Sequence, residues 1–446
     1  MPKRNVIIIG SAGRDFHNFN TYFKNNQAYN VVGFTGSQQI PGISGKTYPT
    51  ELAGSLYPEG IPIYAEGELP RLIKELKVDD CVFAYSDVSY QHVMRIGSIV
   101  NAAGASYMML GPGDTMIRSG KPVIAVCAVR TGAGKSQTSR KVIEHLRAKG
   151  LQVVAIRHPM PYGELVTQRV QRFAEIGDME KHHCTIEEIE EYEPHVVQGT
   201  VVYAGADYAA IVEAAEKDPK GCDVIVWDGG NNDFPFLRPD LMITVADPHR
   251  PGHEASYYPG EVNVRMADVV IINKVDSAAA ENVRKVRESI AAINPAATVV
   301  QAASIIRVDD PQLIKGKRVL VVEDGPTLTH GGMSYGAGTI AAQKGGAAEL
   351  VDPRPYAVDS IAQAFKNYPN IGALLPATGY GAQQLKHLEA TINRTDCDAV
   401  LVATPIDLSR IIDIRKPSTR VFYELEEIGS PNLSEIVSDF VKAHST

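Results

Sequence analysis

A glycine-rich segment between a buried strand and a helix sets the fold class of this chain. The apolar run PVIAVCAV leads into the loop RTGAGKS at residues 130–136, and the stretch that starts at Ser136, SQTSRKVIEHLRAKG, has the pattern of a helix. An unbroken apolar run is typical of a strand that is covered on both faces of a parallel sheet. The segment therefore predicts an α/β fold with a ligand-binding loop at the end of a central strand.

The loop has the residues that a phosphate site requires. Glycines let the backbone approach the ligand, and the helix that follows offers N–H groups and the positive end of its dipole. We expect Lys135 to reach the β- and γ-phosphates and the Ser136 hydroxyl to bind Mg²⁺, as in a P-loop NTPase. The usual first glycine is Val129 here, and Arg130 is a candidate cation for transition-state charge. The predicted nucleotide-binding residues of the loop are Thr131, Gly132, Ala133, Gly134, Lys135, Ser136 and Gln137.

Two later strand ends complete a predicted nucleotide site. Asp228 ends the run CDVIVWD, and an acid at the end of a buried strand is costly unless it faces a site, so we expect it to hold Mg²⁺ and take part in catalysis with Arg130 and Lys135. The run DVVIINK leads into Asn273, Lys274 and Asp276, which we expect to face the nucleotide base. This NKxD pattern is typical of guanine recognition, and a strand-end Asn-Lys pair also lies beside adenine in related P-loop proteins. We therefore expect ATP as the nucleotide, and GTP stays possible.

The order of apolar runs predicts the domain organisation. Eight such runs follow residue 121, most of them separated by segments of helix length, and this alternation is typical of a mainly parallel, doubly wound sheet. The run NVIII followed by GSAG begins a separate Rossmann-like unit. We expect a Rossmann-like domain at residues 1–118 with a substrate or regulatory role, a P-loop NTPase domain at 119–346, and a C-terminal α/β extension or small lobe at 347–446.

Composition narrows the class of partner. The 446 residues carry a net charge of −8, whereas a bulk binder of nucleic acid would normally be basic. No apolar run of 18 residues is present, so no membrane span is expected. The five cysteines are widely spaced and form no CxxC pair, and the adjacent His182 and His183 lack a second pair spaced for zinc. We therefore expect a cytoplasmic protein with reduced thiols.

The motifs together resemble the cyclic 2,3-diphosphoglycerate synthetase family. The resemblance is carried by VRTGAGKS, WDGGNNDFPF, INKVD and VEDGPTLTHGGMSYGAG and covers roughly residues 1–410. It implies an ATP-dependent, Mg²⁺-dependent ligase that activates a small anionic phosphorylated acid by phosphoryl transfer. The phosphate loop also resembles the branch of P-loop proteins that includes dethiobiotin synthetase, where dimers place an extra cation across the interface. We accordingly expect a homo-oligomer, most simply a dimer, in which Arg130 is that cation.

An anionic donor that meets an anionic acceptor needs several cations besides Lys135. Strand ends and glycine-rich turns supply the candidate residues for substrate binding, although a surface or packing role is the more common one for each residue alone. These candidates are Arg157, His158, His249, Arg250, His330, Arg14 and His17.

A different class of function also fits part of the sequence. The NKxD pattern suits a regulatory GTPase or metallochaperone-like switch that acts on a protein partner. The large N-terminal domain and the glycine-rich segment at residues 325–346 favour a cleft for a small molecule instead.

Overall fold

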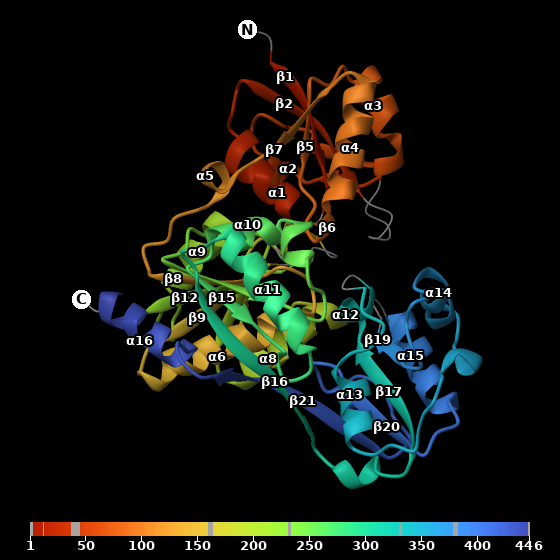
Figure 1. Ribbon diagram of the computed structural model, residues 1–446. Coiled ribbons are helices and arrows are strands. Elements are labelled where there is room, and N and C mark those ends of the chain that lie inside the picture. The colour runs from red at the N-terminus through yellow and green to blue at the C-terminus, as the bar shows by residue number, and fades with distance from the viewer. Residues whose placement is uncertain are drawn as a thin grey trace.

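The chain folds into an α/β structure with an N-terminal domain, a P-loop domain and a C-terminal lobe (Figure 1). The computed structural model describes residues 3–11, 13–36, 45–158, 164–230, 233–329, 332–377 and 382–444. In Figure 1 the N-terminal domain lies at the top, above the P-loop domain, and the lobe lies beside the latter. Within the described residues, no helix has the length and apolar character needed to cross a membrane.

The N-terminal domain is a six-stranded sheet with strand order β3-β4-β2-β1-β5-β7. Each paired neighbour is parallel except β3 with β4. Alternate residues of β1 enter two different cores, Val6 and Ile8 on one face and Ile7 and Ile9 on the other, so both faces are covered. The strands are β1 (Arg4–Ile9), β2 (Tyr29–Gly36), β3 (Thr47–Tyr48), β4 (Ile61–Ala65), β5 (Asp80–Phe83) and β7 (Ser106–Met109). The helices are α1 (Arg14–Asn18), α2 (Thr50–Ala53), α3 (Leu69–Glu75), α4 (Tyr90–Ala103) and α5 (Pro112–Thr115).

The P-loop domain supplies the larger part of a 13-stranded sheet, in the order β10-β11-β9-β12-β8-β13-β15-β16. Only β10 among these strands is antiparallel to its neighbour, which confirms the prediction of a mainly parallel sheet. The strands are β8 (Val123–Ala128), β9 (Val153–Arg157), β10 (Gln171–Phe173), β11 (Val201–Ala204), β12 (Val224–Asp228), β13 (Leu241–Ala246), β15 (Val269–Ile272) and β16 (Thr298–Val308). The helices are α6 (Lys135–Ala148), α7 (Gly177–Lys181), α8 (Ile186–Val197), α9 (Tyr208–Glu216), α10 (Gly260–Met266) and α11 (Ala280–Ile293).

The C-terminal lobe continues the same sheet through β21 (Ser418–Ile428). One end of β21 pairs antiparallel with β16, and its other end pairs parallel with β20, so β21 joins the lobe to the P-loop domain. The remaining strands are β17 (Arg318–Asp324), β18 (Glu349–Leu350), β19 (Leu375–Ala377) and β20 (Ala399–Ala403). The helices are α12 (Gly325–Thr329), α13 (Ala337–Lys344), α14 (Ser360–Asn367), α15 (Ala382–Arg394) and α16 (Leu433–His444).

The core of the lobe extends from Ile314 to Val421, so the expected division at residue 346 falls inside it. The last helix, α16, leaves the lobe and packs against α6 of the P-loop domain, with Leu433 and Val437 in the same core as Val142. The division of the chain into domains remains a prediction, and these contacts favour a boundary near residue 310.

A two-stranded ribbon joins the N-terminal domain to the P-loop domain. Strand β6 (Val88–Ser89) pairs antiparallel with β14 (Tyr257–Tyr258). Next to this ribbon the Tyr90 hydroxyl donates to Glu261 Oε2 at 2.5 Å. The turn that precedes β6 is thereby held beside the loop between β8 and α6.

Candidate functional site

The loop between β8 and α6, residues 129–134, has the backbone geometry of a phosphate-binding loop. Gly132 and Gly134 have φ angles of 79° and 112°, which favour glycine. A Cβ at Gly134 would lie 2.1 Å from Asn273 Nδ2 and 2.6 Å from Gln137 Nε2, so no side chain fits there. Helix α6 starts at Lys135, and its first N–H groups and dipole are available to an anion.

Replacement of Gly134 by alanine is expected to abolish nucleotide binding. The new methyl group would displace Asn273, and the positive φ adds strain, so the loop must move. Titration calorimetry with ADP measures the effect. Gly113→Ala is the matched control, because no heavy atom lies within 4 Å of its ideal Cβ position. Equal ADP affinity in the two variants would contradict the assigned role of this loop.

Lys135 and Asp228 form a buried ion pair at the start of α6. Lys135 Nζ lies 2.7 Å from Asp228 Oδ1, and Arg157 and His195 contact the other oxygen, the His195 Nε2 at 2.8 Å. Burial opposes ionisation of Asp228, but the charges of Arg157 and Lys135 and the hydrogen bond from His195 together hold its pKa well below the usual value. Burial and the charge of Arg157 lower the pKa of Lys135 to about 8, and the nearby carboxylate limits that shift.

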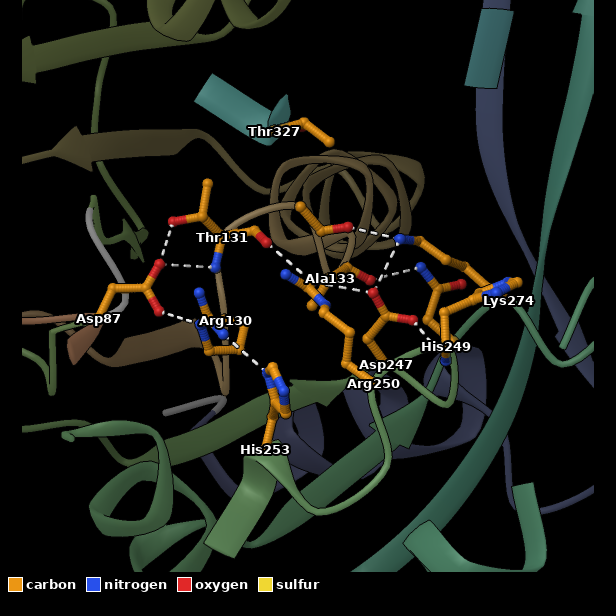
Figure 2. Close-up of polar contacts among 12 residues, drawn as sticks. Asp87, Arg130, Thr131, Ala133, Asp247, His249, Arg250, His253, Lys274 and Thr327 are labelled. Atoms are coloured by element: carbon orange, nitrogen blue, oxygen red, sulfur yellow. Dashed lines mark hydrogen bonds and ion pairs between the residues drawn. The ribbon is translucent and has the colours of Figure 1, made fainter. Parts of the chain in front are cut away.

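The opposite side of the loop is held through its carbonyl groups. Asn273 Nδ2 donates to Ala133 O at 2.9 Å, Lys274 Nζ donates to Gly132 O at 2.5 Å, and an Arg250 N–H donates to Thr131 O at 2.8 Å. Asp247 accepts from both cations, from Arg250 at 2.9 Å and from Lys274 at 3.1 Å (Figure 2). Burial opposes ionisation of Asp247, but Lys274 and Arg250 lower its pKa to about 2.

Arg130 and Thr131 are held by a carboxylate of the N-terminal domain. Asp87 Oδ1 accepts from Arg130 Nε at 2.5 Å, and Asp87 Oδ2 accepts from the Thr131 amide at 3.1 Å and from its hydroxyl at 2.6 Å (Figure 2). The Arg130 guanidinium lies 3.7 Å from the ring centroid of Tyr257 and bonds to His253 Nδ1 at 2.7 Å. Burial and the charges of Arg130 and Arg250 lower the pKa of His253 to about 4, so its neutral ring accepts this bond.

A cavity of about 230 Å³ opens beside the phosphate loop and reaches the C-terminal lobe. Cations from the P-loop domain line one part of it, and carboxyl groups and tyrosines line another. The residues that line the cavity include Arg130, Lys135, Ser136, Arg140, Arg157, His158, Glu190, His249, Lys274, Glu323, Asp324 and Tyr423.

The structure brings most of the predicted site residues to this cavity. Thr131, Gly132, Gly134 and Gln137 line it, while Ala133 and Asn273 lie buried behind the loop. Asp276 Oδ1 accepts from the Ser304 amide at 3.0 Å, so its carboxylate supports the neighbouring strand.

The predicted substrate residues lie in different parts of the structure. Arg157, His158 and His249 line the cavity, whereas Arg250 lies beneath the phosphate loop. Arg14 pairs with Asp233 at 3.2 Å, and the His17 ring stacks on Phe236 with 4.0 Å between centroids, so both contact the P-loop domain and lie outside the cavity lining. His17 Nε2 also lies 2.6 Å from Thr115 O of the N-terminal domain. His330 lies outside the described residues.

Some residues with clear structural roles were not predicted. Asp247 ends a strand, and that position is a signal that also picked out Asp228. His195 lies on α8 and Asp87 lies in another domain, and no local pattern marks either one.

The site fits the oxygen donors that Mg²⁺ prefers. Ser136 lines the cavity beside Lys135, and Asp228 lies at the carboxyl end of the neighbouring strand β12. Within the described residues, no group of three or more His, Cys, Asp or Glu side chains is arranged to hold a metal. Mg²⁺ keeps several water ligands and takes much of its shell from phosphates, so Ser136 and Asp228 would be its protein ligands here.

The fold and the site define a P-loop enzyme, and comparison with known proteins identifies its family. The family described as "Cyclic 2,3-diphosphoglycerate synthetase, P-loop domain" matches residues 198–303, a range that includes Asp228 and Asn273. The chain is 60% identical to arginine synthetase ArcE of Thermococcus kodakarensis over 99% of this chain and 97% of that protein. The chain therefore belongs to the same family as this arginine synthetase, and its P-loop region resembles that of the cyclic 2,3-diphosphoglycerate synthetases.

Other known proteins have a lower sequence identity to this chain. A cyclic 2,3-diphosphoglycerate synthetase of Thermococcus onnurineus is 25% identical over 51% of this chain and 57% of that protein. A structure of LpxK from Aquifex aeolicus with ATP covers 78% of this chain and 97% of its own at 12% identity, with a TM-score of 0.42.

Proposed function

We propose that the chain is an ATP- and Mg²⁺-dependent synthetase that forms a C–N bond on a small amino acid, with arginine as its product. Two buried or partly buried carboxyl groups that line the same cavity as the phosphate loop are the main support. The arginine synthetase, which is similar over its full length, supports the choice of product.

The carboxyl groups are Glu323 and Asp324, at the end of β17. Within the described residues, neither forms an ion pair with a lysine or arginine, and burial raises the pKa of both. Burial raises the pKa of Tyr423, and the negative charge of Asp324 raises it further. Glu190 and Glu323 act on this pKa in the same direction. Glu323 accepts hydrogen bonds from the amides of Gly336, Gly338 and Thr339, and Asp324 accepts from the amide of Thr327. Two carboxyl groups on this side of the cavity favour a cationic or neutral hydrogen-bonding group over a second polyanion.

The reaction that fits joins ATP, a ureido amino acid and ammonia. Citrulline differs from arginine by oxygen in place of one guanidino nitrogen. Transfer of the γ-phosphoryl group to this oxygen would give ADP and a phosphorylated isourea, and attack by ammonia on its carbon would release phosphate and give arginine. Lys135 would neutralise the β- and γ-phosphates, and bound Mg²⁺ would add positive charge to the same oxygens.

The family also supports a second acceptor. Cyclic 2,3-diphosphoglycerate synthetases share the P-loop region, and cations such as Arg157, His158 and Arg140 line the cavity, so a small phosphorylated acid stays the alternative. A GTPase switch that acts on a protein partner is less well supported, since Asp276 bonds to the Ser304 amide. The expected homo-oligomer remains a prediction, although Arg130 is bound within its own chain.

Phosphate release tests the choice of acceptor. ATP and GTP are each supplied with Mg²⁺ alone, with citrulline and ammonium, and with 2,3-diphosphoglycerate. The proposal requires ATP turnover that rises several-fold only with citrulline and ammonium together. Stimulation by 2,3-diphosphoglycerate alone would instead support the phosphorylated acid, and acceptor-independent GTP turnover would support the switch.

Asp324→Asn is expected to raise the KM for the amino acid about tenfold, because the variant keeps the shape of the side chain and loses the charge. The dissociation constant of ADP should change less than twofold, since Asp324 belongs to the lobe. Initial rates with varied citrulline provide the KM, and calorimetry provides the ADP affinity. Exposed Asp396, at the other end of the lobe's strands, gives the control Asp396→Asn. An unchanged KM in Asp324→Asn would contradict the assigned acceptor side.

A further inference from the structure

The turn that precedes β6 places one carboxylate of the N-terminal domain on two successive residues of the phosphate loop. Asp87 bonds to the Arg130 guanidinium with one oxygen and to the Thr131 amide and hydroxyl with the other. The side chains of Arg130 and Asp87 are only 6% and 8% exposed. An ion pair this well shielded, with hydrogen bonds to both oxygens, fixes geometry more firmly than a surface pair does.

The surroundings of this pair restrict it further. The ring of Tyr257 on β14 lies against the guanidinium, and β14 pairs with β6, which directly follows Asp87. Asp87 itself has a φ of 56°, an uncommon angle for a residue other than glycine. The ribbon therefore positions the carboxylate, and the carboxylate holds Arg130 together with His253 and Tyr257.

The N-terminal domain contacts the loop at Arg130 and Thr131, where Arg250 and His253 of the P-loop domain also bond. Lys135 bonds to Asp228, and the carbonyls of Gly132 and Ala133 accept from Lys274 and Asn273, all within the P-loop domain. The carboxylate of Asp87 thus reaches the first part of the loop (Figure 2). Since Arg130 also lines the cavity, its position affects the charge available to a transferring phosphoryl group.

We propose that Asp87 is a positioning residue of the nucleotide site, supplied by the N-terminal domain, which sets Arg130 and Thr131 for phosphoryl transfer. Correct docking of the N-terminal domain is thereby a condition for turnover and has little effect on nucleotide affinity. The inference rests on the proposed nucleotide turnover and does not depend on which acceptor is used.

Asp87→Asn tests this role, because asparagine keeps the shape and removes the charge. We expect kcat for ATP turnover to fall about tenfold, with the dissociation constant of ADP within twofold of the parent value. Asp114→Asn, at an exposed position of α5, is the control and should leave both quantities unchanged. The double variant Asp87→Asn/Arg130→Lys should be no slower than Arg130→Lys alone, because the two residues act as a unit.

A second measurement does not require turnover. Hydrogen exchange of the peptide that contains the Thr131 amide should be faster in Asp87→Asn than in the parent chain, since that amide loses its acceptor charge. If Asp87→Asn does not fold, the same measurements are made on Asp87→Glu. This variant keeps the negative charge and changes only the position of the carboxylate.

The outcomes separate this inference from the proposed function. Three results would each overturn the role of Asp87. They are a kcat of Asp87→Asn equal to that of the parent, a double variant whose loss of kcat is the product of the two single losses, and an unchanged rate of hydrogen exchange at the Thr131 amide. A wrong acceptor would lower turnover in parent and variants alike. The ratio of variant turnover to parent turnover would then stay the same, whether or not an acceptor is present.

Discussion

Replacing Lys135 with alanine is expected to lower kcat/KM for ATP turnover about 10³-fold, or about 4 kcal/mol of transition-state stabilisation. Lys135 is the cation at the start of α6, directly beside the strand-end carboxylate Asp228, and it lines the cavity that also reaches Glu323 and Asp324. Asp228 keeps Arg157 and His195 as partners, so the fold should survive the change. Steady-state phosphate release provides the measurement.

Lys141→Ala is the matched control for this variant. Lys141 lies on the same helix and forms a surface pair with Glu144, so its loss should cost less than about 1 kcal/mol of stability and leave turnover unchanged. A Lys135→Ala protein that turns over ATP within tenfold of the parent would rule out a phosphate-binding role for this lysine.

Replacing Asp228 with alanine is expected to lower the free energy of unfolding of the P-loop domain by about 3–5 kcal/mol. Asp228 is fully buried, and its removal leaves Lys135, Arg157 and His195 together without a shared anion. The change in the midpoint of urea-induced unfolding measures the loss. ATP turnover should be lost as well, because the same carboxylate is the proposed support for Mg²⁺.

The surface residue Asp439 provides the comparison for Asp228. Its side chain is 77% exposed and pairs with Lys442, so Asp439→Ala should change the free energy of unfolding by less than about 0.5 kcal/mol. If the two alanine variants unfolded at the same urea concentration, the buried cluster would not have the stabilising role that we assign to it.

The sequence predicted the strands that are buried on both faces. The runs that became β8, β12 and β15 are unbroken and apolar because helices cover both sides of them. Strand β21 was not predicted, since its buried apolar residues are only Val421 and Leu425, and Glu424, Glu426 and Glu427 interrupt the apolar pattern. Its partner β16 precedes it by more than 100 residues, and this long-range pairing leaves no local signal.

The site was predictable where adjacent parallel strands end together. Strands β8 and β12 are neighbours, so the loop that ends in Lys135 and the carboxylate of Asp228 meet at one edge of the sheet. Asp87 could not be found in this way, because it reaches the loop from another domain through the β6–β14 ribbon. The acceptor side depends likewise on how the lobe packs, which brings Asp324 and Tyr423 to the same cavity.

The most direct test of the proposed reaction is a search for its product. The purified chain is incubated with ATP, Mg²⁺, citrulline and ¹⁵N-labelled ammonium, with the Lys135→Ala protein as the blank, and mass spectrometry follows arginine. The account predicts arginine with one ¹⁵N atom in its guanidino group, formed in step with ADP. ATP consumption without labelled arginine, or turnover that responds only to 2,3-diphosphoglycerate, would contradict it.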